Sequence, residues 1–251
     1  MMELKEFLTL LNQDIETGTQ SDAWDHHEFA DHFFETTREG FLPHHEEIEF
    51  LLPHLGEGPF LDLGCGRGRL SSPLRENAPG IALDISFASL KGHPQPIQAD
   101  LRDLPVQGPF SLALMAFGQA CFLSREELTQ TLKQLKRQLK PEGKIYLDLP
   151  TIELMQEMDS QNEFVKHGDW TAFYTRQFEP GTSRLLQRAT LIHNQTCEVK
   201  SYSFAYQLYS LYELLELFRE LRFRVEYGFE DLDSGPIKET SPWMVFLLQK
   251  I

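Results

Sequence analysis

The chain has 251 residues, 41% hydrophobic and 24% charged, which are ordinary values for a globular protein and exclude intrinsic disorder. The 38 Asp and Glu outnumber the 23 Lys and Arg and give a net charge of −15, so the surface would repel nucleic-acid phosphates. We therefore expect no nucleic acid among its partners.

No apolar run approaches the roughly 18 residues that span a bilayer, and the first residues lack the basic and apolar regions of a secretory signal. The three cysteines, Cys65, Cys121 and Cys197, are far apart and form no Cys-x-x-Cys pair. These features predict a cytoplasmic protein without a membrane segment, while the oligomeric state stays open.

Four zones follow one another along the chain, and the first, residues 1–55, is the most acidic. Its first 50 residues hold 13 acids against only Lys5 and Arg38, a local net charge of −11. Apolar residues recur there at helical spacing, which predicts an N-terminal helical cover. These residues are Phe29, Phe33 and Phe34, and then Ile48, Leu51 and Leu52.

The second zone, residues 56–150, alternates short apolar runs with helical stretches, as a parallel, doubly wound sheet does. The clearest helix covers 124–139, with Ser124 as N-cap, and ends before Lys140-Pro141-Glu142-Gly143, which predicts a stop and a turn. The predicted strands are 59–63, 80–85, 96–99, 110–117 and 144–149.

The third zone, residues 151–209, contains three β-branched and aromatic runs between 170 and 209, separated by turns at 180–182 and 194–196. This pattern predicts an antiparallel β-meander. The fourth zone, residues 210–251, returns to the earlier rhythm with a helix over 211–221 and strands at 222–229 and 243–249. The meander is therefore predicted to be an insertion into one α/β domain.

The most informative segment is a predicted strand that runs into a glycine loop, Asp62-Leu63-Gly64-Cys65-Gly66-Arg67-Gly68. The glycines let a ligand lie against bare backbone at a helix N-terminus. A dinucleotide enzyme would show Gly-x-Gly-x-x-Gly, but here the third glycine comes one residue early. Asp62 would disfavour a pyrophosphate and would suit an ammonium group, although an ordinary tight turn is the alternative interpretation.

Two further acids end the next two predicted strands. Asp84 ends the run that starts at Gly80, where a carboxylate can accept hydrogen bonds from both hydroxyls of a ribose. Asp100 follows the next run, where it can accept a hydrogen bond from an adenine amino group. Together with Asp62, these acids are spaced as an amino acid joined to adenosine would require.

This segment resembles motif I of the class I S-adenosylmethionine-dependent methyltransferases, in particular their small-molecule branch. The similarity covers about residues 40–251 and includes several later motifs. They are Leu83-Asp84-Ile85-Ser86, 99–105, 110–123, Leu139-Lys140-Pro141-Glu142-Gly143-Lys144, 209–214, Tyr227-Gly228 and Ser241. The resemblance implies an α/β, Rossmann-like, seven-stranded, mostly parallel sheet with helices on both faces, joined here by the meander and the N-terminal helices.

The resemblance also implies a set of cofactor-binding residues. The methionyl group would lie near the backbone of Asp62, Leu63 and Gly64, the rest of the loop (Cys65, Gly66 and Gly68), and the main chain of Met115 and Ala116. The ribose would lie on Asp84, and the adenine between Ile85 and Leu101 with Asp100 at its amino group. One departure concerns 86–95, which is short and leaves room for barely two turns of helix after Asp84.

The methyl acceptor is expected between the accessory parts of the chain. The candidate acceptor-binding residues are aromatic: Trp24, Phe33, Trp170, Tyr174, Tyr202, Phe204 and Tyr206. The alternative is that the meander aromatics simply pack on the main domain, since alternation alone reports burial. Arg38 could bind the methionyl carboxylate or an anionic acceptor, or equally form a salt bridge with neighbouring acids.

Methyl transfer needs few obligatory side chains, because the cofactor carries the activation. His27 and Asp148 are the candidates for a general base, and Asp148 is the better placed, at the end of a strand. The N-terminal histidines lack metal-ligand spacing, so no metal is expected. Cys65 is interpreted as a small packing residue rather than a nucleophile.

These residues predict a methyltransferase that moves a methyl group from S-adenosyl-L-methionine to an unidentified small molecule, on N, O, S or C, and releases S-adenosyl-L-homocysteine. A non-catalytic protein that only binds this cofactor or its product is the alternative. A nicotinamide-dependent oxidoreductase is the third possibility, and the glycine spacing fits it poorly.

Overall fold

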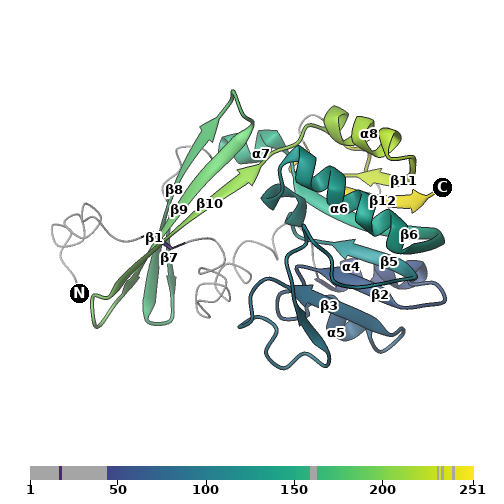
Figure 1. Cartoon of the computed structure of the whole chain (residues 1–251). Coiled ribbons are helices and arrows are strands. Elements are labelled where there is room, and N and C mark those ends of the chain that lie inside the picture. Colours follow the sequence, from purple (N-terminus) through teal and green to yellow (C-terminus); the bar gives the residue numbers. More distant parts are fainter. Residues whose placement is uncertain (1–16, 19–43, 159–162, 231, 233–234, 239–240) are drawn as a thin grey trace.

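The computed structural model describes residues 17–18, 44–158, 163–230, 232, 235–238 and 241–251. They build two β-sheets, a larger one wrapped by helices and a smaller one that extends from it (Figure 1). The strands of the larger sheet are β2 (Phe60–Leu63), β3 (Gly80–Asp84), β4 (Pro96–Gln98), β5 (Phe110–Met115), β6 (Leu139–Pro150), β11 (Phe223–Phe229) and β12 (Trp243–Lys250).

The larger sheet has the strand order β11-β12-β6-β5-β2-β3-β4. All neighbouring pairs are parallel except those of β12, which runs antiparallel to both β6 and β11. The chain order reverses between β2 and β5, and such a switch point opens a ligand-binding crevice at the carboxyl ends of the strands. The predicted seven-stranded, mostly parallel sheet is confirmed.

Helices cover both faces of this sheet. Their bounds are α4 (His44–Leu51), η1 (Leu52–His54), α5 (Ser71–Leu74), η2 (Gln119–Phe122), α6 (Arg125–Gln138), α7 (Ile152–Glu157) and α8 (Leu211–Glu220). On one face α6 and α8 pack on Leu61, Ile145 and Phe246, and on the other α4 and α5 pack on Phe60 and Tyr146. Because both faces are buried, the strands are continuous apolar runs rather than alternating ones.

The two longer predicted helices are confirmed, and each begins with a capping box. Ser124 accepts from the Glu127 N–H while the Glu127 side chain accepts from the Ser124 N–H, and Ser210 and Glu213 do the same for α8. Each box satisfies backbone donors that the first turn of a helix leaves open, which fixes where the helix starts.

One local prediction was wrong. The expected turn at 140–143 is the first part of β6, which begins at Leu139 opposite Phe110 and takes a left-handed residue at Glu142, with φ of 57°. The short segment 86–95, which departs from the family pattern, forms only tight turns and no helix. Gly92 has a φ of 94°, and with Pro94 it interrupts any helix there.

The smaller sheet has the order β1-β10-β9-β8-β7. Its strands are β1 (Thr17–Gly18), β7 (Glu163–His167), β8 (Trp170–Glu179), β9 (Arg184–His193) and β10 (Val199–Gln207). β7 to β10 form an antiparallel meander, which confirms the three predicted runs, and the sequence did not predict β7. The division of the chain into zones at 55/56, 150/151 and 209/210 stays a prediction.

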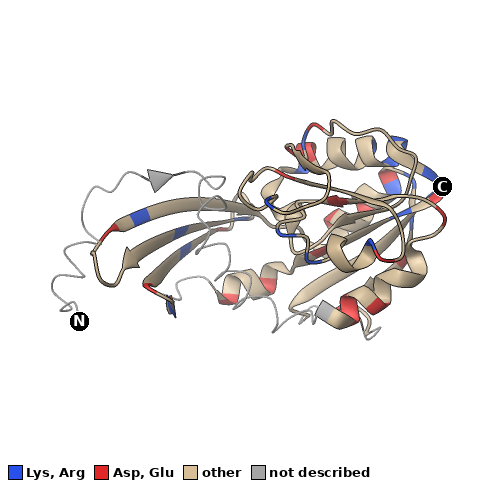
Figure 2. Ribbon diagram, turned by 90° about the horizontal axis from the view of Figure 1, so that it is seen from below, with Lys and Arg blue, Asp and Glu red and all other residues tan. Residues whose placement is uncertain are grey.

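Most of the predicted N-terminal helical cover lies outside the described residues, which include only β1, α4 and η1 from this zone. In the described part, Lys and Arg are interspersed with Asp and Glu over both sheets (Figure 2). None of the described helices is long and apolar enough to cross a membrane.

Replacing Phe246 tests how α8 is held on the sheet. The Phe246 side chain is fully buried, and its ring meets that of Phe218 edge to face at a centroid distance of 5.2 Å. Phe246→Ala should lower the free energy of unfolding by about 3–5 kcal/mol, because it leaves a cavity between helix and sheet. Urea unfolding measures the loss. Tyr212→Ala, at an exposed position of α8, should change the same quantity by less than about 0.5 kcal/mol.

Candidate functional site

The glycine loop connects β2 to α5 at the switch point and is shaped by left-handed backbone. Gly64 has a φ of 66° and Gly68 a φ of 80°. A Cβ on Gly64 would lie 2.3 Å from the Gln119 side chain, and one on Gly68 would lie 2.2 Å from the ring of His93. Only glycine satisfies both the conformation and the lack of space at these two positions.

Asp84 holds the loop in place from the neighbouring strand. Its Oδ2 accepts from the Gly66 N–H at 2.8 Å, and its Oδ1 accepts from the Ser86 N–H at 2.8 Å. The side chain is buried at the carboxyl end of β3. Asp84 thereby ties the glycine loop to the end of β3 and to the turn that follows it.

An ion pair connects the end of the glycine loop, where the chain enters α5, to helix α4. Arg69, the residue after the last loop glycine, forms a two-pronged ion pair with Glu47, at 2.6 Å and 3.2 Å. The Glu47 side chain is fully buried. A paired guanidinium and carboxylate fix both position and orientation, so the loop is held from two directions.

Asp62, the predicted partner of an ammonium group, lies in β2 and is only 3% exposed. Burial, with the Asp84 carboxylate nearby, raises the pKa of Asp62 to about 7, and Ser71 opposes the rise. The ionised form of a buried carboxyl group is costly unless a positive group joins it. The site therefore favours a cationic group at this point.

The predicted adenine side lies beyond Asp84. Asp100 accepts hydrogen bonds from the Arg102 guanidinium, the shortest at 2.6 Å, and this arginine lowers the pKa of Asp100. Leu101 is partly buried, whereas Ile85 is 41% exposed and Phe87 is 69% exposed. Exposed apolar side chains beside an acid suit a planar ring. The sequence analysis did not single out Phe87, since its exposure is known only from the structure.

β5 ends at Met115 and is followed by Ala116, and both residues are buried. The next two residues, Phe117 and Gly118, are left-handed. This loop after β5 leads to Gln119, whose amide Nε2 lies 3.4 Å from the Gly64 carbonyl oxygen. Gln119 thus faces the glycine loop directly. Nothing in the sequence indicated this residue, because the contact joins positions 55 residues apart.

Asp148, a predicted general-base candidate, is fully buried in β6. Its Oδ1 accepts from the Phe117 N–H at 2.7 Å, the Gly118 N–H at 3.2 Å and the Trp243 Nε1–H at 3.1 Å. The carboxylate thus joins the β5 loop to β12. This geometry favours a positioning role for Asp148 over proton transfer with a substrate.

The meander aromatics share one face of the smaller sheet, which we call the aromatic face; it consists of Trp170, Tyr174, Tyr202, Phe204 and Tyr206. The predicted alignment of Tyr202, Phe204 and Tyr206 is confirmed, and all five residues are buried. The Tyr206 ring lies 5.2 Å from that of Phe122 in η2, so the face begins at the carboxyl edge of the larger sheet. A binding role for it stays a prediction.

The predicted Trp24, His27, Phe33 and Arg38 lie outside the described residues. Cys65 is buried, and burial raises the pKa of its thiol, which fits packing between the glycines. Within the described residues, no group of three or more His, Cys, Asp or Glu side chains could hold a metal ion.

Comparison with known proteins finds similarity to methyltransferases over part of the chain. A family model described as a methyltransferase domain matches residues 60–143. The curated Bacillus subtilis (strain 168) protein named "Putative methyltransferase YqeM" is 29% identical over 143 residues, which cover 52% of this chain. The matched part spans 57% of the length of that relative.

Solved structures extend the similarity of fold to nearly the whole chain. An S-adenosylmethionine-dependent methyltransferase from Clostridium acetobutylicum ATCC 824 has a TM-score of 0.77 at 14% identity, over 88% of this chain and 97% of that one. CalS10 from Micromonospora echinaspora, an amino pentose methyltransferase solved with S-adenosylmethionine bound, has a TM-score of 0.63 at 15% identity. That alignment covers 87% of this chain and 96% of CalS10.

Replacing Asp148 separates positioning from proton transfer. Asp148→Ala leaves the Phe117 and Trp243 donors without their buried acceptor, so the free energy of unfolding should fall by about 2–5 kcal/mol. Chemical unfolding followed by tryptophan fluorescence measures the loss, and Glu220→Ala, at an exposed position, is the control. An Asp148→Ala protein of unchanged stability would contradict the positioning role.

Proposed function

We propose that this chain, whose core is a methyltransferase domain on the fold of the class I S-adenosylmethionine-dependent enzymes, transfers a methyl group to a small molecule. The observation that carries the proposal is the arrangement at the switch point. A buried acid at the end of β2, a left-handed glycine loop and a second acid at the end of β3 lie together there. An ammonium, a carboxylate-bearing chain and a ribose need these three elements in this order.

The described residues fit S-adenosylmethionine. Asp62 supplies the negative group that an ammonium would stabilise, the bare backbone at Gly64 admits a close ligand, and Asp84 lies where a ribose would follow. Ile85, Leu101 and Asp100 would then hold the adenine. When bound, this cofactor supplies an electrophilic methyl group, and the chain has to align the acceptor with it.

The acceptor is proposed to be a small molecule. CalS10, which shares the fold, is an amino pentose methyltransferase, and the net charge of −15 disfavours nucleic acid as a substrate. All three cysteines are free, and Cys197 is exposed, which suits a reducing cytoplasm. We assign no general base, since His27 lies outside the described residues and Asp148 holds the β5 loop.

Thermal shift with three ligands tests the cofactor. S-adenosylmethionine and S-adenosylhomocysteine, each at a hundred times its dissociation constant, should stabilise the protein by about 2.7 kcal/mol, and NAD should not. Asp84→Asn should weaken this effect at least about tenfold in affinity, because its amide group cannot accept in place of the lost oxygen. Asp103→Asn, the same change at an exposed position, should not. A shift with NAD alone would overturn the assignment, and binding without any methyl transfer across an acceptor screen would indicate a binding protein.

The ionisation of Asp62 predicts a pH dependence of cofactor binding. In the free protein its pKa is raised to about 7, so below that pH the ammonium must displace a proton. The affinity for S-adenosylmethionine should therefore rise with pH and level off above about pH 8, by up to about tenfold per unit on the acid side. Titration calorimetry at several pH values measures it. Asp62→Asn should bind more weakly and lose this slope.

The same ionisation affects the free protein in the opposite direction. Because the folded state holds the Asp62 proton more tightly than the unfolded state, its contribution to stability falls as the pH rises from about 4 to about 7. Asp62→Asn should flatten that part of the stability profile, and an unchanged profile would contradict the raised pKa.

A further inference from the structure

The aromatic face contains one polar pair, Arg176 of β8 and Gln187 of β9. The two residues are directly opposite in the strand register, and Gln187 is in turn opposite Phe204 of β10. The Arg176 side chain is 6% exposed and Gln187 is 5% exposed. A charged and an amide group at this depth, between tyrosines and phenylalanines, need partners to offset the loss of water.

Arg176 has partners. Its Nε donates to Gln187 Oε1 at 2.7 Å, and one terminal nitrogen donates to Glu163 Oε2 at 3.0 Å. Its guanidinium also lies over the Tyr174 ring, 5.4 Å from the centroid. The Glu163 side chain is 51% exposed, so the arginine charge is balanced by an acid that still reaches water.

One hydrogen-bond donor of Gln187, its amide nitrogen, has no partner among the described residues. Because arginine has no acceptor, the bond to Arg176 fixes the amide oxygen toward it and turns Nε2 the other way. This Nε2 is buried and has no hydrogen-bond partner within the part of the chain that the structure describes. An unpaired buried donor destabilises the fold, and an apolar residue of similar size would avoid the cost.

The Arg176–Gln187 pair lies one row of side chains farther from η2 than Tyr206 does. Tyr206 contacts Phe122 of η2 at 5.2 Å, and the Phe204 ring stacks on that of Tyr206 at 6.3 Å. Gln187 and Arg176 are in the Phe204 row, and rows on one face of a sheet are about 7 Å apart. Along this face the polar pair is therefore farther from η2 than Tyr206 is.

We propose that Gln187 and Arg176 recognise the methyl acceptor by donating hydrogen bonds to a carbonyl or carboxylate oxygen of it, while its ring lies along Phe204 and Tyr206. The inference rests on the proposed function and adds the substrate class: a ring compound with an oxygen acceptor remote from the methylated atom. A ligand oxygen would accept the hydrogen bond that Gln187 Nε2 otherwise lacks. Specificity follows, since a molecule without that oxygen would leave the donor unpaired.

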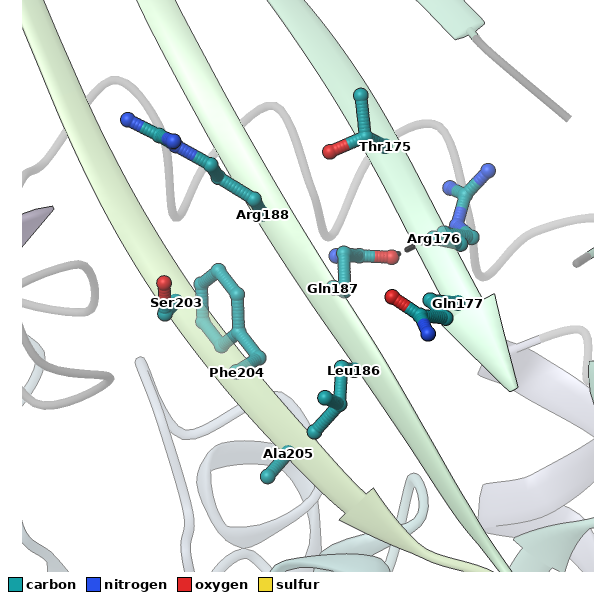
Figure 3. Close-up of a pocket in the computed structure, with 9 residues that line it drawn as sticks. All are labelled: Thr175, Arg176, Gln177, Leu186, Gln187, Arg188, Ser203, Phe204 and Ala205. Atoms are coloured by element: carbon teal, nitrogen blue, oxygen red, sulfur yellow. Dashed lines mark hydrogen bonds between the residues drawn. The ribbon is translucent and has the colours of Figure 1, made fainter. Parts of the chain in front are cut away.

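The opposite face of the same strands supplies a control residue for testing this proposal. A hollow of about 410 Å³ lies against this stretch, and Figure 3 shows its lining with the Arg176–Gln187 hydrogen bond. By strand alternation, Thr175, Gln177 and Leu186 point away from the aromatic face. Gln177 is exposed to water, so it supplies a matched control on the wrong face.

The test compares three small probes, 4-aminobenzamide, 4-aminobenzoate and aniline, whose affinities for the protein in the presence of S-adenosylhomocysteine are measured by ligand-observed NMR. The native protein should bind at least one of the two oxygen-bearing probes about tenfold more tightly than aniline. Tighter binding of 4-aminobenzamide would indicate recognition of a neutral carbonyl oxygen, and tighter binding of 4-aminobenzoate would indicate recognition of a carboxylate. Gln187→Glu keeps the acceptor for Arg176 but removes the donor, so this preference should disappear without a fall in melting temperature. Gln177→Glu should keep the preference.

Equal binding of all three probes, no binding of any of them, or a preference that survives in Gln187→Glu would overturn the proposal. The thermal shift with S-adenosylhomocysteine is recorded on the same samples. If that shift is present while the probe preference is absent, the recognition site fails and the proposed function stands; if the shift itself is absent, the proposed function fails.

Discussion

The site depends on a carboxylate that reaches from one strand to the loop of its neighbour. Asp84 of β3 accepts from the Gly66 N–H and so fixes the loop that follows β2. Asp148 of β6 does the same for the loop that follows β5, through Phe117 and Gly118. Because β2 and β5 are adjacent at the switch point, these two clamps set both walls of the crevice.

The two acids differ in what surrounds them. Asp84 lies at the end of its strand and supports the bare glycine backbone, whereas Asp148 is closed in by Trp243 and the β5 loop. One acid therefore fixes the loop of the proposed cofactor site, and the other supports the loop after β5. The smaller sheet then adds a surface of different chemistry, aromatic with one polar pair, that starts at η2.

Much of this could be predicted from the sequence because the signals are local. The apolar runs, the glycine spacing, Asp62 and Asp84 at strand ends, and the capping residue Ser124 each act within a few positions of the chain. Together they gave the sheet, its helices and the place of the glycine loop.

The rest depends on contacts between distant residues. Gln119 against Gly64, Asp148 against Trp243 and Arg69 against Glu47 join elements that no periodicity links. The interpretation of Asp148 as a base came from its position at a strand end, and only its three donors indicate support instead. The segment after Asp84 was predictable as a departure from the family pattern, since it is short and contains Gly92 and Pro94, but its turns and the exposure of Phe87 were not.

The three cysteines differ in a way that has a practical consequence. Cys65 and Cys121 are buried, and burial raises the pKa of the Cys121 thiol to about 12, so both are poor nucleophiles. Cys197 is exposed, in the turn between β9 and β10 at the outer end of the smaller sheet (Figure 1). The native chain therefore offers a single attachment point for a thiol-reactive dye. Energy transfer from tryptophan to that dye would make the outer end of the smaller sheet optically visible in the unmodified sequence.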